Sequence, residues 1–172
     1  MSYTSLGTMF ILNTNPYMRT FDTDLEIGHR AEEYILEKLQ LLYPTMRSIK
    51  VKNVDYDLID DNKTSVEVKL DIKSQETGRV AIEYMHRGNP SGISISKATL
   101  WVLIYYLEDE WVWTFMETDL LRKFIKRNHA KHTRYIGDGD KSSLLFIDAL
   151  EIANAFGYFE IESKLSYNNI LD

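Results

Sequence analysis

Apolar residues recur along the chain at two different spacings, and each spacing predicts a different kind of element. From about residue 24 to 42 they return at intervals close to one helical turn, which predicts an amphipathic helix. Thr23, with Glu26 three positions later, matches a capping box and is expected to start this helix, which Pro44 is expected to stop. Before the helix, residues 1–18 carry no charged side chain, and we expect an irregular arm there.

Three stretches after this helix alternate apolar with charged side chains. They cover about residues 54–58, 66–72 and 80–85, and Gly78 is expected to form the turn between the second and the third. Successive side chains of a strand point to opposite faces, so this alternation predicts strands that each have one apolar and one acidic face.

The second half of the chain contains a nearly continuous apolar run from Trp101 to Leu107, typical of a central strand that is covered on both faces. Around it the pattern predicts a polar helical turn over 94–97, a strand over 111–116, a helix over 118–127, a strand over 144–147 and a last helix that Asp148 caps. This order predicts a single α/β (α+β) domain over residues 19–172, in which helices flank one central mixed β-sheet.

Charge and composition exclude several classes of protein. The 172 residues include 26 Asp and Glu against 20 Lys and Arg, a net charge of −6, and no Cys. Disulfides, thiolate metal sites and cysteine nucleophiles are therefore excluded, and the acidic balance argues against coating nucleic acid by bulk charge. The longest apolar run has ten residues, whereas a membrane-spanning helix needs about 20. These features predict a soluble cytoplasmic protein without a membrane partner.

Acidic residues and one lysine recur on the polar faces of the three predicted strands. If the strands are neighbours, Asp57, Glu67, Lys69 and Glu83 converge on one side of the sheet. Clustered carboxylates must raise their pKa values or bind a cation, and hard oxygen ligands suit Mg²⁺ or Mn²⁺. A lysine two residues after one ligand is placed to hold or deprotonate a metal-bound water.

The same residues also fit a simpler interpretation. A solvated sheet face with charge pairs across its strands shows this pattern too, and an acid two positions before a lysine occurs four times in the chain. Glu32 lies near the apolar stripe of the first helix, where it is either a paired or ligating acid or an exposed edge residue. The residues alone leave both interpretations open.

Three segments resemble the PD-(D/E)XK nuclease superfamily: Tyr56–Leu58, Ser65–Asp71 and Val80–Tyr84. The following Asn89–Ala98 is similar to a segment of its small phage-encoded members, and the resemblance extends over about residues 24–150. It implies a restriction-endonuclease-like core and a metal-dependent endonuclease that hydrolyses phosphodiester bonds of DNA. It also implies a homodimer, since cutting both strands is easiest with two equivalent sites.

The resemblance also assigns roles to single residues. Asp57 and Glu67, joined by the main-chain carbonyl of Val68, would bind Mg²⁺ or Mn²⁺. Lys69 would position or activate the attacking water and stabilise developing negative charge. Glu83 and Glu32 match the positions of accessory acids.

Basic residues concentrate between Arg122 and Arg134, where six occur without any acid. This segment is a candidate for gripping phosphates, although a solvated helix face with cations at its carboxyl end explains it equally well. Together with the Ser-rich turn before Trp101, the predicted nucleic-acid contacts are Ser91, Ser96, Lys97, Arg122, Lys126, Arg127, Lys131 and Arg134.

The leading hypothesis from the sequence is therefore a metal-dependent endodeoxyribonuclease. One alternative is a module with the same fold that holds nucleic acid or a protein without cutting. Another is an interaction protein that assembles through residues 1–18. The sequence leaves open whether the substrate is duplex, single-stranded or branched DNA, or RNA.

Overall fold

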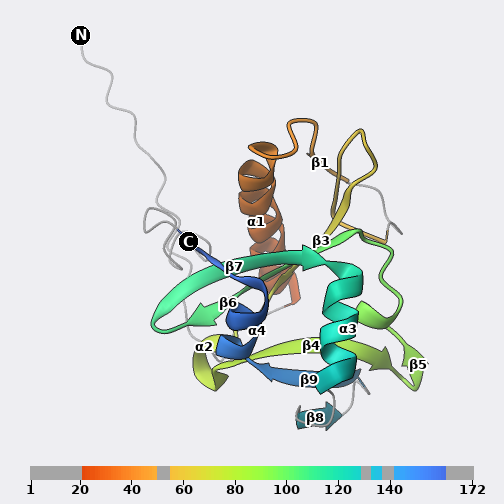
Figure 1. Cartoon of the computed structure of the whole chain (residues 1–172), viewed down its shortest axis with the longest axis vertical. Helices are drawn as coiled ribbons and strands as arrows, with labels where there is room; N and C mark the ends of the chain where they lie inside the picture. Colours follow the sequence, from red (N-terminus) through yellow and green to blue (C-terminus); the bar gives the residue numbers. More distant parts are fainter. Residues whose placement is uncertain (1–20, 50–54, 129–132, 137–141, 162–172) are drawn as a thin grey trace.

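The computed structural model describes residues 21–49, 55–128, 133–136 and 142–161, and within them the strands form two sheets (Figure 1). The first sheet has the order β1 (Arg47–Ser48), β2 (Leu58–Ile59), β3 (Ser65–Leu70), β6 (Leu100–Leu107), β7 (Glu110–Glu117) and β10 (Phe159–Glu160). The second has the order β5 (Asn89–Pro90), β4 (Arg79–His86), β9 (Ser142–Asp148) and β8 (Thr133–Ile136). The helices are α1 (Phe21–Gln40), α2 (Ser74–Thr77), the short 3₁₀ helix η1 (Gly92–Ser94), α3 (Thr118–Asn128) and α4 (Ala149–Phe156).

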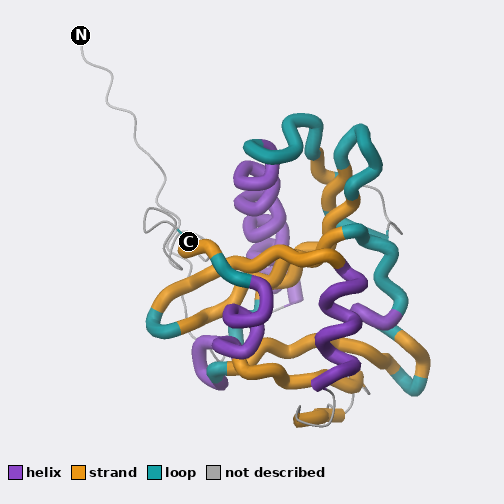
Figure 2. The backbone as a smooth tube through the Cα atoms, in the orientation of Figure 1, coloured by secondary structure: helices purple, strands orange, loops and turns teal. Residues whose placement is uncertain are grey.

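The first sheet is mixed and forms the middle layer of the molecule. Strands β3 and β6 run parallel, and its other neighbouring pairs are antiparallel. Helix α1 covers one face, whereas α3, α4 and the second sheet lie on the other side (Figure 2). The prediction of a mixed sheet flanked by helices is confirmed.

Strand β6 is buried on both faces, as the apolar run predicted. Trp101, Leu103 and Tyr105 belong to the core shared with α3, α4 and the second sheet. Val102 and Ile104, which alternate with them, belong to the core under α1. Except at Tyr106, which is only partly buried, a charged side chain on β6 would be buried in one of the two cores.

Helix α1 forms where the apolar spacing predicted it. Ala31, Ile35 and Leu39 are almost fully buried and pack against the face of the first sheet. The capping prediction for Thr23 is wrong, because the helix begins two residues earlier and Thr23 lies inside its first turn. The helix ends at Gln40, before Pro44.

The other predicted elements differ in how well they match. Strands β7 and β9 and helices α3 and α4 lie where they were expected, and the Asp148 carboxylate caps α4 by accepting from the Leu150 N–H at 2.9 Å. The helical turn expected over 94–97 is wrong, because the turn is η1, two residues earlier. Of the first predicted strand only Leu58 is in β2, since residues 55–57 are not strand and residue 54 lies outside the described residues.

The prediction of a single central sheet is wrong. Strand β4 does not join β3 but pairs with β9 in the second sheet. Between β3 and β4 the chain forms the one-turn helix α2, which ends at Gly78 with a left-handed φ of 65°. That turn redirects the chain into a different layer.

Within the described residues, no helix is long and apolar enough to cross a membrane. The arm predicted over residues 1–18 lies outside the described part of the chain.

Candidate active site

Asp57 lies immediately before β2 and is fixed to the edge of β3. Its N–H donates to the Val66 carbonyl at 2.8 Å, and its carboxylate accepts from the Val68 N–H at 2.7 Å. The paired residues of β2 and β3 end at Leu58 and Val66. Beyond this pair the Asp57 carboxylate, in place of a main-chain carbonyl, accepts the hydrogen bond from β3. The N–H and C=O of a strand residue point to the same side. The Val68 carbonyl therefore faces the same edge as the Asp57 carboxylate.

Glu67 and Lys69 lie on the face of β3 opposite α1. They alternate with Val66 and Val68, which are buried beneath the helix. Lys69 Nζ lies 2.5 Å from Glu67 Oε1, and the two side chains are 51% and 17% exposed. Among the described residues, Lys69 is the main group that offsets the negative charge of the Glu67 carboxylate. The Lys69 side chain remains accessible to solvent in this ion pair.

Burial and neighbouring charges shift the pKa values of both members of this pair. Burial raises the pKa of Glu67, and the nearby Asp57 adds to this, while Lys69 opposes it. Burial alone lowers the pKa of Lys69, but the surrounding Glu67, Asp57 and Glu32 carboxylates outweigh it, and the pKa is raised. Lys69 is therefore a firmly protonated ammonium at neutral pH.

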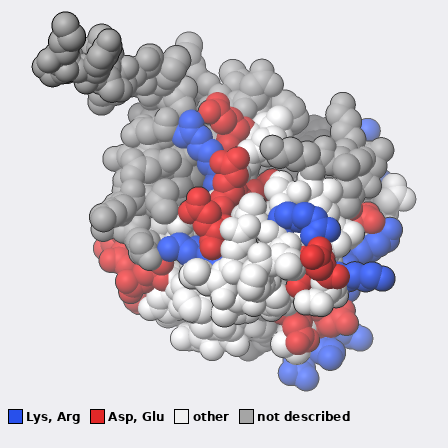
Figure 3. All heavy atoms as spheres, turned by 90° about the horizontal axis from the view of Figure 1, so that it is seen from above, with Lys and Arg blue, Asp and Glu red and all other residues white. Residues whose placement is uncertain are grey.

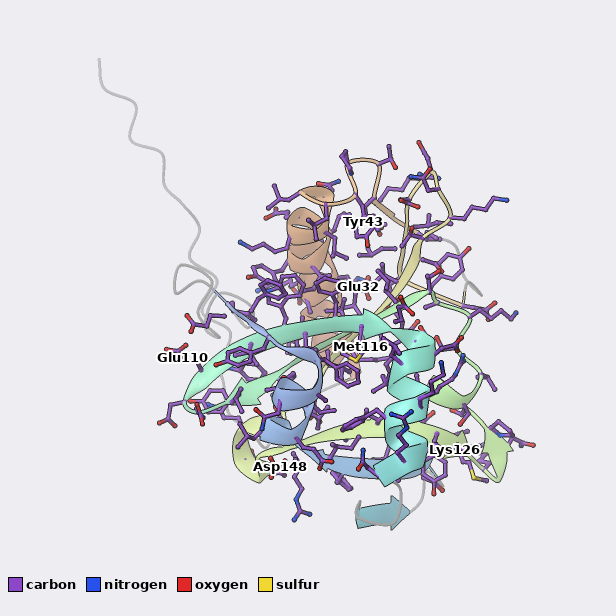
Figure 4. The ribbon with its side chains drawn as sticks, viewed as in Figure 1. Glu32, Tyr43, Glu110, Met116, Lys126 and Asp148 are labelled. Carbon is purple, nitrogen blue, oxygen red and sulfur yellow. The ribbon has the colours of Figure 1, made fainter. Side chains whose placement is uncertain are left out.

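Glu32 on α1 completes the group. It is half-buried on the side of the helix that faces the strands (Figure 4). Burial raises its pKa, followed by repulsion from Asp57, whereas His29 and Lys69 lower it. Glu32 is thus not an isolated surface residue. Glu32, Asp57, Glu67 and Lys69 form one electrostatically coupled set, which we call the acid cluster.

Glu83 reaches this region by a different route from the one expected. Its strand belongs to the second sheet, so the condition under which Glu83 was expected to join Glu67 and Lys69, that their strands are neighbours, is not met. Glu83 instead borders the same cavity as Glu67 and Lys69, a space of about 380 Å³ between the two sheets that we call the acid cavity. The Ser91 hydroxyl donates to the Glu83 carboxylate, and a β-bulge lies between Glu83 and Met85. Bulges often re-aim a side chain beside a functional site.

Asp71 is a member of this region that the site prediction did not include. Its carboxylate accepts from the Ala81 N–H at 2.7 Å, which ties the end of β3 to β4 across the acid cavity. Burial raises its pKa, although main-chain N–H donors oppose the shift. The signal was present in the sequence, since Asp71 continues the period-two pattern of Glu67 and Lys69.

Most of the predicted nucleic-acid contacts in the turn before β6 already have partners. The Ser91 hydroxyl is bonded to Glu83, and Ser96 Oγ accepts from the Trp101 indole N–H at 2.9 Å. Lys97 forms an exposed ion pair with Asp55 at 2.7 Å. These bonds shape the turn before β6.

The basic residues of α3 fall into two groups. Arg122 donates to the carbonyls of Ile93 and Ser96 at 3.0 and 2.5 Å, and so holds the turn that contains η1 against α3. Lys126 (Figure 4) and Arg127 are in the last turn of α3. Both are exposed. Arg134 lies in β8, and Lys131 lies outside the described residues. On the face seen in Figure 3, acidic and basic side chains are interspersed.

The described residues contain no group of three or more His, Cys, Asp or Glu side chains placed to hold a metal ion. The expected donor set contains two carboxylates and one carbonyl. Comparisons with family models, curated proteins and solved structures found no match.

Proposed function

We propose that the protein is a metal-dependent endodeoxyribonuclease with a restriction-endonuclease-like core, and that the acid cluster is its active site. One observation carries the proposal. The Asp57 carboxylate is fixed by the Val68 N–H at the edge of the strand that presents Glu67 and Lys69. Two carboxylates, an adjacent carbonyl and an ammonium group are thus gathered at one end of β3.

The charge balance of the cluster fits a divalent cation. Glu32, Asp57 and Glu67 are carboxylates that interact electrostatically with one another, and Lys69 is the basic side chain that interacts with all three. Burial is the main cause of the raised pKa values of Glu32 and Glu67, and repulsion from Asp57 adds to both shifts. Asp57, Glu67 and the Val68 carbonyl would hold Mg²⁺ or Mn²⁺, ions that prefer hard oxygen ligands. A bound ion of this kind supplies Lewis acidity and lowers the pKa of a bound water.

The side chains of the cluster have separate tasks in this proposal. Lys69 is protonated and half exposed, so its ammonium donates hydrogen bonds and stabilises the negative charge that develops on the phosphate. It does not accept the proton of the attacking water. Glu32 is the better proton acceptor, because its raised pKa makes it more basic than an ordinary carboxylate. Glu83 borders the acid cavity on the wall opposite Glu67 and Lys69. From there it helps to orient Lys69.

The test compares two lysines that each follow an acid by two positions. Lys69→Ala should abolish Mn²⁺-dependent nicking of plasmid DNA, whereas Lys73→Ala should not, because Lys73 is exposed beyond the end of β3. Thermal melting of both variants checks that the fold is retained. Cleavage by Lys69→Ala at the rate of the unaltered protein would contradict the assignment. DNA binding without cleavage by the unaltered protein would favour a binding module.

The proposed function also implies a cellular location and an oligomeric state for the protein. A DNA endonuclease without a membrane partner is placed in the cytoplasm, where it meets its substrate. We expect a homodimer, since two equivalent sites allow both strands of a duplex to be cut. Sedimentation of the protein with and without DNA measures this.

A further inference from the structure

A second cavity is bordered by β4, η1 and α3. It has a volume of about 360 Å³, and we call it the α3 pocket. It is lined by Tyr84, Ile93, Ser94, Arg122, Ile125 and Lys126. Pockets of this size commonly hold small organic groups between apolar walls, with a few polar groups at the rim.

The lining of the α3 pocket combines an aromatic ring, aliphatic walls and a cation. Ile93 and Ile125 are buried and form the apolar walls next to the Tyr84 ring. Three nitrogen atoms of Arg122 are engaged, with two main-chain carbonyls and with Asp119, so this side chain builds the wall. Lys126 is exposed and forms no ion pair with any described residue. A flat aromatic group that carries a negative charge is complementary to such a pocket.

The α3 pocket and the acid cavity share one wall. Glu83 borders the acid cavity, and the next residue, Tyr84, borders the α3 pocket. In the same way Gly92 belongs to the acid cavity and Ile93 to the α3 pocket. Because consecutive residues border the two cavities, a single strand of a few nucleotides is long enough to reach from one cavity to the other.

We propose that the α3 pocket receives an unpaired nucleotide of the strand whose phosphate lies at the acid cavity. The Tyr84 ring stacks on the base, and Lys126 contacts a neighbouring phosphate. This inference rests on the proposed function and narrows it. A base inside a duplex must first be unstacked and unpaired before it can enter a pocket, which costs free energy, so the preferred substrate has single-stranded or extrahelical nucleotides.

The experiment measures DNA binding separately from cleavage. A fluorescently labelled single-stranded 15-mer and the same sequence as a duplex are titrated with protein carrying Lys69→Ala, in Mn²⁺, and anisotropy gives the affinities. The single strand should bind more tightly than the duplex. Tyr84→Leu should weaken single-strand binding by roughly 5- to 150-fold, the range for losing one base stack, while Tyr84→Phe should retain it.

Two lysines on α3 provide the matched comparison. Lys126→Ala should weaken binding and lower the salt dependence by about one phosphate contact. Lys123→Ala removes the same charge from the same helix, but Lys123 is exposed and does not line the pocket. Its effect should be smaller. This comparison remains informative if the Tyr84 variants fold poorly.

The outcomes separate this inference from the nuclease assignment. Equal affinity for single strand and duplex would overturn the pocket, as would equal effects of Lys126→Ala and Lys123→Ala. If the unaltered protein does not cut DNA but single-strand binding depends on Tyr84 and Lys126, the nuclease proposal fails and the pocket stands. If it cuts duplex and single-stranded DNA equally, and the Lys126→Ala variant does so too, the nuclease proposal stands and the pocket fails.

Discussion

Gly92 marks the closest approach between the turn before β6 and the wall of the acid cavity. Its φ is 52°, and a Cβ placed there would lie 2.9 Å from the carbonyl carbon of Glu83 and closer still to its oxygen. Gly92→Ala therefore combines two penalties. A left-handed conformation costs an L-residue about 1–2 kcal/mol, and forcing a methyl group against main chain costs about 1–3 kcal/mol more. The expected loss is about 2–5 kcal/mol.

Gly78 offers a control that carries only the first penalty. Its φ is 65°, but a Cβ there would meet no atom within 4 Å. For a chain of this length each kcal/mol lowers the melting temperature by about 2–4 °C. Gly78→Ala should therefore lower it by about 2–8 °C, and Gly92→Ala by about 4–20 °C. Differential scanning calorimetry of both variants checks this. Equal melting temperatures would show that the Glu83 main chain does not press on Gly92, and the described wall of the acid cavity would be wrong.

Three further predictions concern single side chains. Ser91→Ala removes the hydroxyl that holds Glu83, a charged hydrogen bond, and should slow single-turnover DNA cleavage on the order of tenfold, while Ser91→Thr should not. Burial raises the pKa of Asp71 above 3.8, so the folded protein binds that proton more tightly and stability falls as pH rises through the raised pKa. Asp71→Asn should weaken this fall in melts between about pH 4 and 7. Asp148→Ala removes the α4 cap and should lower the melting temperature by about 2–4 °C, whereas Asp148→Ser should retain it.

The sequence predicted well those elements whose signal is local. Helix α1 and strand β6 follow directly from the spacing of apolar residues, because a 3.6-residue period or a continuous apolar run depends on burial alone. The Asp148 cap was also predictable, since an N-cap needs only its own side chain and the next few N–H groups.

The pairing of strands was not predictable in the same way. Alternation shows that Glu83 and Glu67 lie on the polar faces of their strands, but it does not show which strands are neighbours. That choice depends on contacts distant in sequence, such as the pairing of β4 with β9. Asp57 was expected on a strand face. It is instead outside β2, and its carboxylate occupies the place where the ladder ends.

The site residues also divide into those that a local pattern brings together and those whose placement depends on contacts distant in sequence. Glu67 and Lys69 lie on one strand two positions apart, so the period of a strand alone brings them together. Glu32 comes from a helix and Glu83 from a second sheet. The sequence shows that both residues are acidic, but it does not show where their side chains point.

Strand β6 gives the molecule a further property, because both hydrophobic cores contain its side chains. Trp101 and Leu103 belong to one core and Val102 and Ile104 to the other. Neither layer can separate from the sheet without exposing this strand, so we expect the described layers to unfold in one cooperative transition. The amide protons of β6 should then be the slowest to exchange with solvent. The layer that presents the acid cluster and the layer that contains the α3 pocket would therefore fold and unfold together.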